Sequence, residues 1–477
     1  MLHELPDYWY SRWLFERGLA VIYLVAFLVA VNQFIPLAGE RGILPAVRFV
    51  REVPFRYSPS LFYWWPTDQA FRIGAWTGVV LSLIALSGIA ARYGAIPAAT
   101  VWAGLYVLYL SFINVGQTWY GFGWESLLVE AGFFTIFAGA SATAPATLLN
   151  WIYRWTLFRL MFGAGLIKLR GDACWRNLTC LDYFFETQPM PNALSWYLHH
   201  LPKPVLHGGV AFNHFVELIV PFGFFLPQPY AGIAGIFTIA FQLILIVGGN
   251  LSWLNWLTIV LAFTTLDDRF LRWLPVSVPP LHSMGAVQKA ATASLAVLVA
   301  FLSIAPTANM LSSRQVMNTS FNPLQIVNTY GAFGSITKER YEIVVEGTTD
   351  ETVTGATTWR EYEFKGKPGD PAYRPPQVAP YHLRLDWLMW FAAMSSPSDY
   401  PWFSELLVKL LQGDRPVLGL LRSNPFPDRP PTWIRAQLYL YRFTTPEEHR
   451  HTGRWWDRQL AAPYFPAVRL KSSQTAR

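Results

Sequence analysis

The sequence is short of charge for its length. Only 14% of its 477 residues are Asp, Glu, Lys or Arg, whereas a soluble chain carries about 25%. Hydrophobic residues make up 53%, and the mean hydropathy is positive, +0.25. This composition excludes a soluble globular enzyme and a disordered protein. With only two cysteines, the chain is not a small disulfide-stabilised scaffold either.

The sequence also lacks the patterns that identify common chemistries. It contains no P-loop, no nucleophile elbow, no H-E-x-x-H and no G-x-G-x-x-G after a strand-like run. The net charge is +7, but the 37 Lys and Arg residues form no basic run of the kind that binds nucleic acid. The sequence therefore predicts no cofactor, no metal site and no nucleic-acid partner, and it identifies no reaction.

The charge that is present is concentrated in the last third of the chain. Residues 1–309 hold 17 Lys and Arg and 14 Asp and Glu, whereas the shorter segment 310–477 holds 20 and 16. Aromatic residues reach 16%, with 22 Trp, as in membrane proteins that place Trp and Tyr at the bilayer surface. We therefore divide the chain into a multi-span transmembrane domain, 1–309, and a water-facing domain, 310–477.

Nine apolar runs approach the roughly 20 residues that a transmembrane helix needs. They lie at about 17–38, 70–91, 95–115, 124–142, 147–169, 205–226, 230–249, 251–266 and 288–306. The eighth run is short and is interpreted as tilted, paired with the seventh, or re-entrant. Gly74 and Gly78 in the second run favour a packing notch within this chain. The predicted fold is a polytopic α-helical membrane protein with about nine transmembrane helices.

The two cysteines, Cys174 and Cys180, lie six positions apart in a long loop, 170–204. Metal sites normally use three or four N or S ligands, and only His199 and His200 are near in sequence. A disulfide is the favoured interpretation, and two unpaired structural cysteines are the alternative. A disulfide would place the loop in an oxidising compartment. With five spans before the loop and four after it, the N-terminus would then be cytoplasmic and residues 310–477 extracytoplasmic.

Charged side chains within a span need a partner or a role, because the bilayer centre disfavours them. Glu125 and Glu130 lie on the fourth run, about 140° apart on an ideal helix, so they do not share a face. The fifth run carries Arg154, Arg159 and Lys168. We expect Glu130 to pair with Arg154 or Arg159, and we keep a functional cavity as the alternative.

The sixth run opens with Asn213, His214 and Glu217. On an ideal helix Asn213 lies about 40° and His214 about 60° from Glu217, so all three share a face. A His beside a carboxylate suits proton transfer or half of a metal site. The sequence offers no third ligand nearby. The favoured interpretation is a hydrogen-bonded cluster between helices.

The segment after residue 309 mixes strand-like and helix-like runs. Alternating patterns predict strands at 339–347, 358–365 and 434–443, and apolar stripes predict helices at 382–394 and 402–412. We therefore predict an α+β domain outside the membrane. Its Tyr, Trp and Arg residues are typical of protein-binding surfaces, although packing against the bilayer would use the same residue types.

Long segments of both halves resemble the lipase maturation factor family. The resemblance is carried by WYGFGWESLLVEAGF (119–133) and FNHFVELIVPF (212–222), and by residues 154–202, 321–348, 359–371, 379–394 and 424–445. It implies a membrane protein whose C-terminal domain faces the lumen of the endoplasmic reticulum in eukaryotic members. Those members assist the folding and assembly of secreted dimeric lipases. The Ala- and Arg-rich composition suits a bacterial homologue, which would lie in the inner membrane.

The membrane block is also distantly similar to the transmembrane domain of vitamin K-dependent γ-carboxylases. This implies an alternative function, a membrane enzyme acting on a lipid, a quinone or an exported protein. Its polar site would contain Lys168, His214 and Glu217. The alternative predicts that these residues converge with Glu125 and Glu130 on one buried cavity.

Our first interpretation is a folding factor without chemistry of its own. It predicts a large aromatic surface outside the membrane and no deep convergent ionisable pocket, and it makes function depend on the outer surface of residues 321–445. The expected partners are the lipid bilayer and exported or secreted client proteins, with lipases among them. The oligomeric state is left open.

Overall fold

The first two-thirds of the chain fold as a helical bundle because the apolar runs are long and contain few charges. The computed structural model describes residues 8–471. In this part, six helical segments are long and apolar enough to cross a membrane, so the chain is a polytopic membrane protein. The segments are α1 (Trp9–Ala38), α3 (Asp68–Ser87), α5 (Ala95–Val115), the continuous run of α11 (Lys203–His214), η4 (Phe215–Ile219) and α12 (Val220–Gly223), α13 (Tyr230–Gly248), and the pair α16 (Ala286–Leu302) and α17 (Ile304–Leu311).

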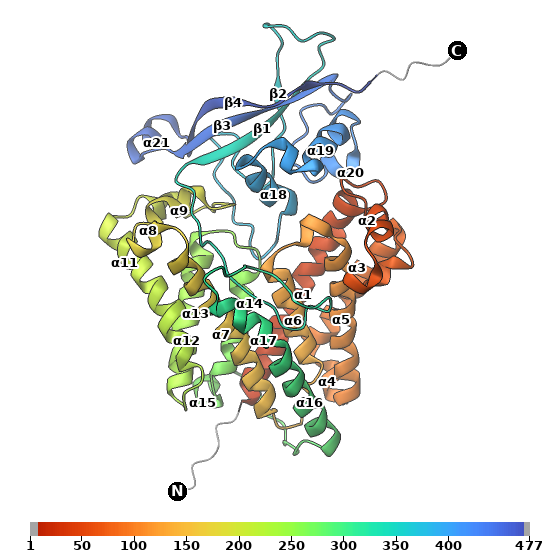
Figure 1. Ribbon diagram of the computed structural model, residues 1–477, viewed down its shortest axis with the longest axis vertical. Helices are drawn as coiled ribbons and strands as arrows, with labels where there is room; N and C mark the ends of the chain where they lie inside the picture. The colour runs from red at the N-terminus through yellow and green to blue at the C-terminus, as the bar shows by residue number, and fades with distance from the viewer. Residues whose placement is uncertain (1–7, 472–477) are drawn as a thin grey trace.

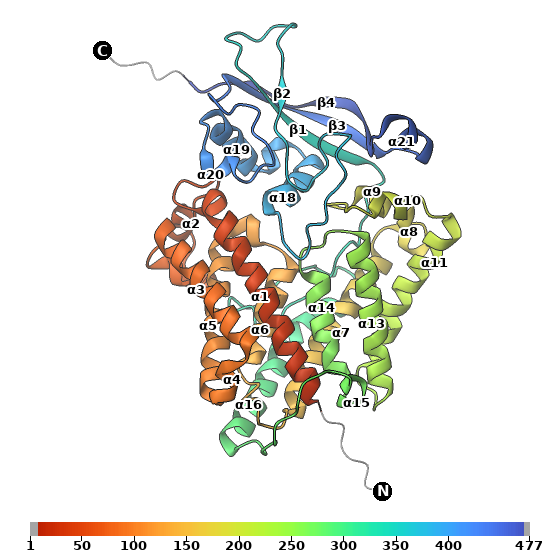
Figure 2. The same cartoon turned by 180° about the vertical axis from the view of Figure 1, so that it is seen from behind.

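The prediction of nine spans is not confirmed, because three of the predicted runs form helices that are too short or too charged to count as apolar membrane spans. α6 (Gly123–Thr135) has 13 residues, about 20 Å, against a hydrocarbon core of about 30 Å. α14 (Leu254–Ala262) is shorter still, and α7 (Thr147–Arg170) is long but carries several cations. All but one residue of α6 are buried, and α7 and α14 lie between α1 and α13 (Figures 1 and 2). Such interior helices face protein rather than lipid, so they tolerate charge.

α1 and α3 approach closely because a glycine lies at their contact. A Cβ atom at Gly78 would lie 2.2 Å from a ring carbon of Phe27. The predicted packing notch is therefore confirmed, with α1 of the same chain as the partner. Thr67 caps the N-terminus of α3, and its side chain accepts a hydrogen bond from the Ala70 N–H at 3.2 Å. The helix ends at Gly88, which adopts a left-handed φ of 68°.

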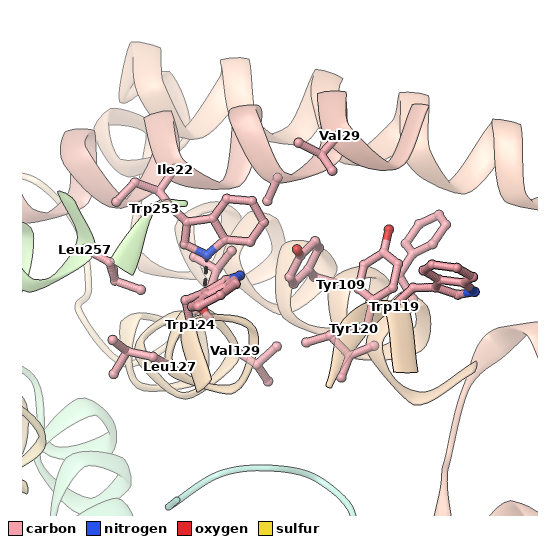
Figure 3. Close-up of a cluster of buried hydrophobic side chains, with 14 of the residues drawn as sticks. Ile22, Val29, Tyr109, Trp119, Tyr120, Trp124, Leu127, Val129, Trp253 and Leu257 are labelled. Carbon is pink, nitrogen blue, oxygen red and sulfur yellow. Dashed lines mark hydrogen bonds between the residues drawn. The ribbon is translucent and has the colours of Figure 1, made fainter. Parts of the chain in front are cut away.

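An aromatic core joins α1, α5, α6 and α14 (Figure 3). The Trp253 indole N–H donates to the Trp124 carbonyl oxygen at 3.1 Å, which ties the start of α14 to α6. The Tyr109 ring meets the Phe27 ring edge to face, with centroids 5.3 Å apart. Large aromatic side chains bury much apolar area, so this cluster stabilises the centre of the bundle.

Short helices form the connections at both ends of the bundle, and α4 and α15 lie at the end opposite the sheet (Figures 1 and 2). They are α2 (Ala46–Glu52), η1 (Phe55–Tyr57), η2 (Leu61–Tyr63), α4 (Ile89–Tyr93), η3 (Gln117–Tyr120), α8 (Ala173–Arg176), α9 (Leu181–Thr187), α10 (Ser195–His199), η5 (Phe263–Thr265) and α15 (Asp268–Leu271).

The C-terminal domain is built on an antiparallel sheet with the strand order β2-β1-β3-β4. Its strands are β1 (Arg340–Thr348), β2 (Arg360–Glu361), β3 (Trp433–Phe443) and β4 (Trp456–Val468), and its helices are α18 (Arg384–Ala393), η6 (Pro397–Asp399), α19 (Pro401–Leu411), α20 (Arg415–Leu418) and α21 (Pro446–Thr452). The three predicted strands and two predicted helices are confirmed as β1, β2, β3, α18 and α19, although β2 is only two residues long. β4 was not predicted.

β3 buries opposite faces at its two ends. Ile434 and Ala436 are buried on one face, whereas Tyr441 and Phe443 are buried on the other. The second face packs on Trp196 of α10. The sheet therefore rests on the loop that also holds α8 and α9, and the start of α1 lies at the opposite end of the bundle (Figure 1).

Hydrogen bonds fix this contact between the loop and the sheet. The Phe443 N–H donates to a Glu186 carboxylate oxygen at 2.7 Å, and the Trp196 indole N–H donates to the Thr444 carbonyl oxygen at 2.8 Å. Burial raises the pKa of Glu186 and lowers the pKa of His199 to about 4. His199 is thus uncharged at neutral pH, and its 3.8 Å contact with Glu186 is not an ion pair there.

Candidate functional site

A cavity of about 690 Å³ lies where the membrane block meets the C-terminal domain. It is lined by residues of α7, α13 and α14 from the bundle, by α18 from the C-terminal domain, and by the segment 330–337 that precedes β1. Most lining side chains are apolar, and a few polar groups converge on it. A large apolar cavity with a few convergent polar groups is the usual form of a binding site.

The polar groups include an ion pair between two helices. Lys168 Nζ of α7 donates to both carboxylate oxygens of Glu217, at 2.6 and 2.7 Å, and to Asn213 Oδ1 at 2.9 Å. The Asn213 side-chain amide in turn donates to Glu217 at 2.9 Å. All three residues are at least nine-tenths buried and line the cavity. The Trp175 ring covers the ammonium group, with its centroid 5.0 Å from Nζ.

The helix that carries Glu217 is widened by a nearby proline. Pro221 has no N–H to donate, and its ring would clash with the carbonyl of Glu217, four residues earlier. The backbone accommodates this with the π-helical turn η4 (Phe215–Ile219). The widened turn separates His214 from the pair. Its Nε2 contacts the Trp175 carbonyl oxygen at 3.0 Å, and His214 does not line the cavity.

Glu130 forms a second buried network, behind the cavity wall. It pairs with Arg159 of α7, as one of the two expected pairings predicted. Its other oxygen accepts from the Tyr330 hydroxyl at 2.7 Å and from the Asn328 N–H at 2.9 Å. Arg154, the other expected partner, donates instead to backbone carbonyls of the bundle. The Glu130 network thus anchors the segment between α17 and β1.

Glu125 forms a third network, which joins α6 to the C-terminal domain. Arg384 of α18 donates to Glu125 at 2.7 Å and to the Trp119 carbonyl oxygen at 2.6 Å. The Tyr109 hydroxyl donates to the other Glu125 oxygen. Arg384 also stacks on Tyr120, with the guanidinium 3.5 Å from the ring centroid. Glu125 and Glu130 thus have separate partners, as their predicted angular separation implies.

The five candidate residues do not converge. Lys168 and Glu217 line the cavity together, whereas Glu125, Glu130 and His214 bond elsewhere. This arrangement departs from what the enzyme alternative predicts. In residues 8–471, no group of three or more His, Cys, Asp or Glu side chains is placed to hold a metal ion.

Sequence reasoning missed several polar residues of this region. Gln242 of α13 and Asn255 of α14 line the cavity and bond to each other at 2.7 Å. The signal that could have identified these two residues is the presence of a Gln and an Asn within long apolar runs. Arg384 was also missed, although a cation within the apolar helix 382–394 is unusual. Its partner Glu125 is 259 residues away, so no local pattern indicates the pairing.

The structure confirms the disulfide between Cys174 and Cys180, whose Cα atoms are 4.7 Å apart. Both cysteines are buried, and they bracket Trp175. The bond therefore closes the short segment whose tryptophan covers Lys168. The disulfide supports the edge of the cavity.

On residues 321–445, all of which the structure describes, few aromatic side chains are exposed. Phe321 and Tyr373 are the only exposed aromatic side chains of this segment, and the others are buried or half-buried. The exposed aromatics gather instead between α2 and α3, where Trp64 and Trp65 are 60% and 67% exposed. Trp at such a position is typical of a membrane–water boundary.

Comparisons with known proteins match both halves of the chain to the same protein family. The model of the lipase maturation factor transmembrane domain matches residues 10–273, and the model of the lipase maturation factor C-terminal domain matches residues 326–466. Lipase maturation factor 1 of Mus musculus is 43% identical, over 97% of this chain and 88% of that protein. The Homo sapiens protein of the same name is 42% identical over the same shares.

More distant relatives cover almost as much of the chain. Lipase maturation factor 2 of Xenopus tropicalis is 30% identical, over 96% of this chain and 82% of that protein. These relatives are vertebrate proteins, so they give no support to the expectation of a bacterial source. No solved structure matches.

Proposed function

Because this chain belongs to the lipase maturation factor family, we propose that it is an integral membrane factor that helps secreted lipases to fold and assemble. The observation that carries the proposal is the 43% identity to lipase maturation factor 1 over 97% of the chain. The similarity spans the bundle, the disulfide segment and the sheet domain together, so it is not confined to a shared membrane anchor. The endoplasmic reticulum membrane is the proposed location, because secreted lipases fold there.

We also propose an orientation for the chain. The disulfide segment and the sheet domain lie at one end of the bundle and α1 begins at the other (Figure 1). A disulfide needs an oxidising compartment, so the sheet domain faces the lumen and α1 begins on the cytoplasmic side. In this arrangement the chain also passes between the two sides along α7, and along the short interior helices α6 and α14 together with their flanking segments, giving nine passes.

The orientation is testable because the described residues contain no free cysteine. Gly355 lies in the connection between β1 and β2, and Gly285 directly precedes α16; these elements lie at opposite ends of the molecule (Figure 1). A Cβ atom at either glycine would meet nothing within 4 Å. In sealed microsomes, a membrane-impermeant maleimide should label Gly285→Cys directly and Gly355→Cys only after the membrane is permeabilised. The reverse pattern would contradict the proposed orientation.

The function is testable by rescue. Cells that lack their own lipase maturation factors would express a secreted dimeric lipase with or without this chain. We expect the chain to raise the secreted lipase activity per unit of lipase mass, because correctly assembled enzyme replaces inactive protein. A normally inserted and abundant chain that leaves this ratio unchanged would refute the proposal.

A further inference from the structure

The cavity reaches from the interior of the bundle to the molecular surface. Its deep wall is formed by α7, α13 and α14, with Met161 and Leu254 among the apolar residues. Met317 and Met394 also line it and are 42% and 43% exposed, so the cavity opens at the junction of the two domains. Its volume of about 690 Å³ falls in the roughly 300–1,000 Å³ range of small-molecule sites.

The polar groups of the cavity carry no net charge. The ammonium of Lys168 is neutralised by the carboxylate of Glu217, and Asn213 bonds to both. An anionic head group would find no unpaired cation there, and a cationic one would find no unpaired anion. The site therefore favours an uncharged ligand.

A second polar position has spare hydrogen-bonding capacity. Gln242 is 4% exposed, and its Oε1 accepts from Asn255 at 2.7 Å. Its side-chain N–H group, however, meets only the sulfur of Met161, at 3.6 Å. A thioether is a weak acceptor, and a buried donor without a good acceptor is costly. An oxygen atom of a ligand in the cavity would satisfy this donor better.

The backbone gives an independent sign of function at the same place. Glu217 lies on the π-helical turn η4, and such turns occur frequently at functional sites. Buried ionisable residues inside a membrane protein are also candidates for functional sites. Both features point to the part of the cavity where the neutral ion pair lies.

We propose that this cavity binds an uncharged single-chain lipid whose polar end carries ester or hydroxyl oxygens. The apolar walls contact the chain, Gln242 donates to a head-group oxygen, and the Lys168–Glu217 pair receives the hydroxyl end. The size suits one chain rather than a whole phospholipid. This binding site goes beyond the proposed folding function and does not depend on it.

The test uses the full chain in phosphatidylcholine nanodiscs and a photoactivatable monoacylglycerol with a diazirine in its chain. Lysophosphatidic acid with the same chain is the anionic counterpart. We expect the monoacylglycerol to label peptides of α7, α13 or residues 330–337, at least fivefold more than the anionic probe does. Equal or stronger labelling of these peptides by the anionic probe would overturn the assignment of an uncharged ligand.

Two variants separate the cavity from the outer surface. Ala164 lines the cavity, whereas Ala300 is exposed on α16. Ala164→Trp should reduce monoacylglycerol labelling of the cavity peptides at least fivefold, and Ala300→Trp should leave it unchanged. Equal labelling in both variants would overturn the proposal, as would a peptide recovered from the cavity of the purified protein in place of a lipid.

A third variant keeps the test open if Ala164→Trp does not fold. Gln242→Leu preserves the side-chain size but removes the amide. We expect it to lose at least threefold in monoacylglycerol labelling while labelling by a diazirine-bearing hydrocarbon of the same length stays constant. Unchanged monoacylglycerol labelling in Gln242→Leu would show that the head group does not bind there and would refute the proposed orientation of the lipid.

Discussion

Replacing Arg384 with Met should loosen the contact between the sheet domain and the bundle. The guanidinium is fully buried and bonds to Glu125 at 2.7 Å and to the Trp119 carbonyl oxygen at 2.6 Å. Arg384→Met leaves the Glu125 carboxylate buried with the Tyr109 hydroxyl but without a cation. Breaking a buried ion pair in this way costs about 3–5 kcal/mol. The effect should be largest at the interface, because the two partners lie on different domains.

The magnitude is best measured in a double-mutant cycle. The free energy of unfolding in mixed micelles would be compared for Arg384→Met, Glu125→Gln and the double variant. Since the double variant leaves no unpaired charge, we expect it to be more stable than Arg384→Met alone. Arg442→Met is the matched control; Arg442 is 47% exposed, and water screens its ion pairs. Strictly additive effects of the two single substitutions would refute the account of domain docking.

Three further predictions concern stability. Gly78→Ala should lower the melting temperature, by overpacking worth about 1–3 kcal/mol, because its Cβ would meet the Phe27 ring; an unchanged melting curve would contradict the close helix contact. Replacing Cys174 and Cys180 together by Ser should cost up to about 2–3 kcal/mol, and thiol titration of the unmodified protein should find no free thiol. Burial lowers the pKa of His382 from its usual 6.5 to about 4 in the folded protein. As the pH falls from 6.5 to 4, the unfolded chain therefore binds a proton that the folded protein does not, and the free energy of unfolding should decrease. In His382→Phe this part of the loss should disappear; an identical pH profile would exclude His382 as its source.

Features that depend on neighbouring residues could be predicted from the sequence. The apolar runs give α1, α3, α5 and α13 because a long run without charge has few alternatives to a helix in a membrane. The disulfide was predictable because its cysteines lie six positions apart. The pairing of Glu130 with a cation of α7 was predictable because consecutive helices usually pack side by side.

Features set by distant contacts could not be predicted. α6 and α14 resemble spans in composition, but their position inside the bundle is decided by the helices around them. Arg384 pairs with a residue in the other domain, and nothing local indicates its partner. β4 escaped prediction because Pro463 and Pro466 argue against a strand; as an edge strand it tolerates them.

The sequence predicts only those parts of the site that depend on neighbouring residues. Asn213 and Glu217 are one helical turn apart, so their bond to each other follows from spacing. The expected position of His214 on the same face assumed an α-helix with 3.6 residues per turn. The π-helical turn caused by Pro221 changes that spacing. The cavity itself is lined by residues of many separate segments, from Thr118 to Tyr400, and has no signature in any one of them.

The assembly state of a newly made lipase tests the central claim most directly. In cells that lack their own lipase maturation factors, a dimeric lipase would be pulse-labelled, and its dimeric and aggregated fractions separated by sedimentation. With this chain present, the account predicts that the native dimer fraction rises at the expense of aggregate before secretion. An unchanged distribution, with the chain inserted and abundant, would contradict the claim.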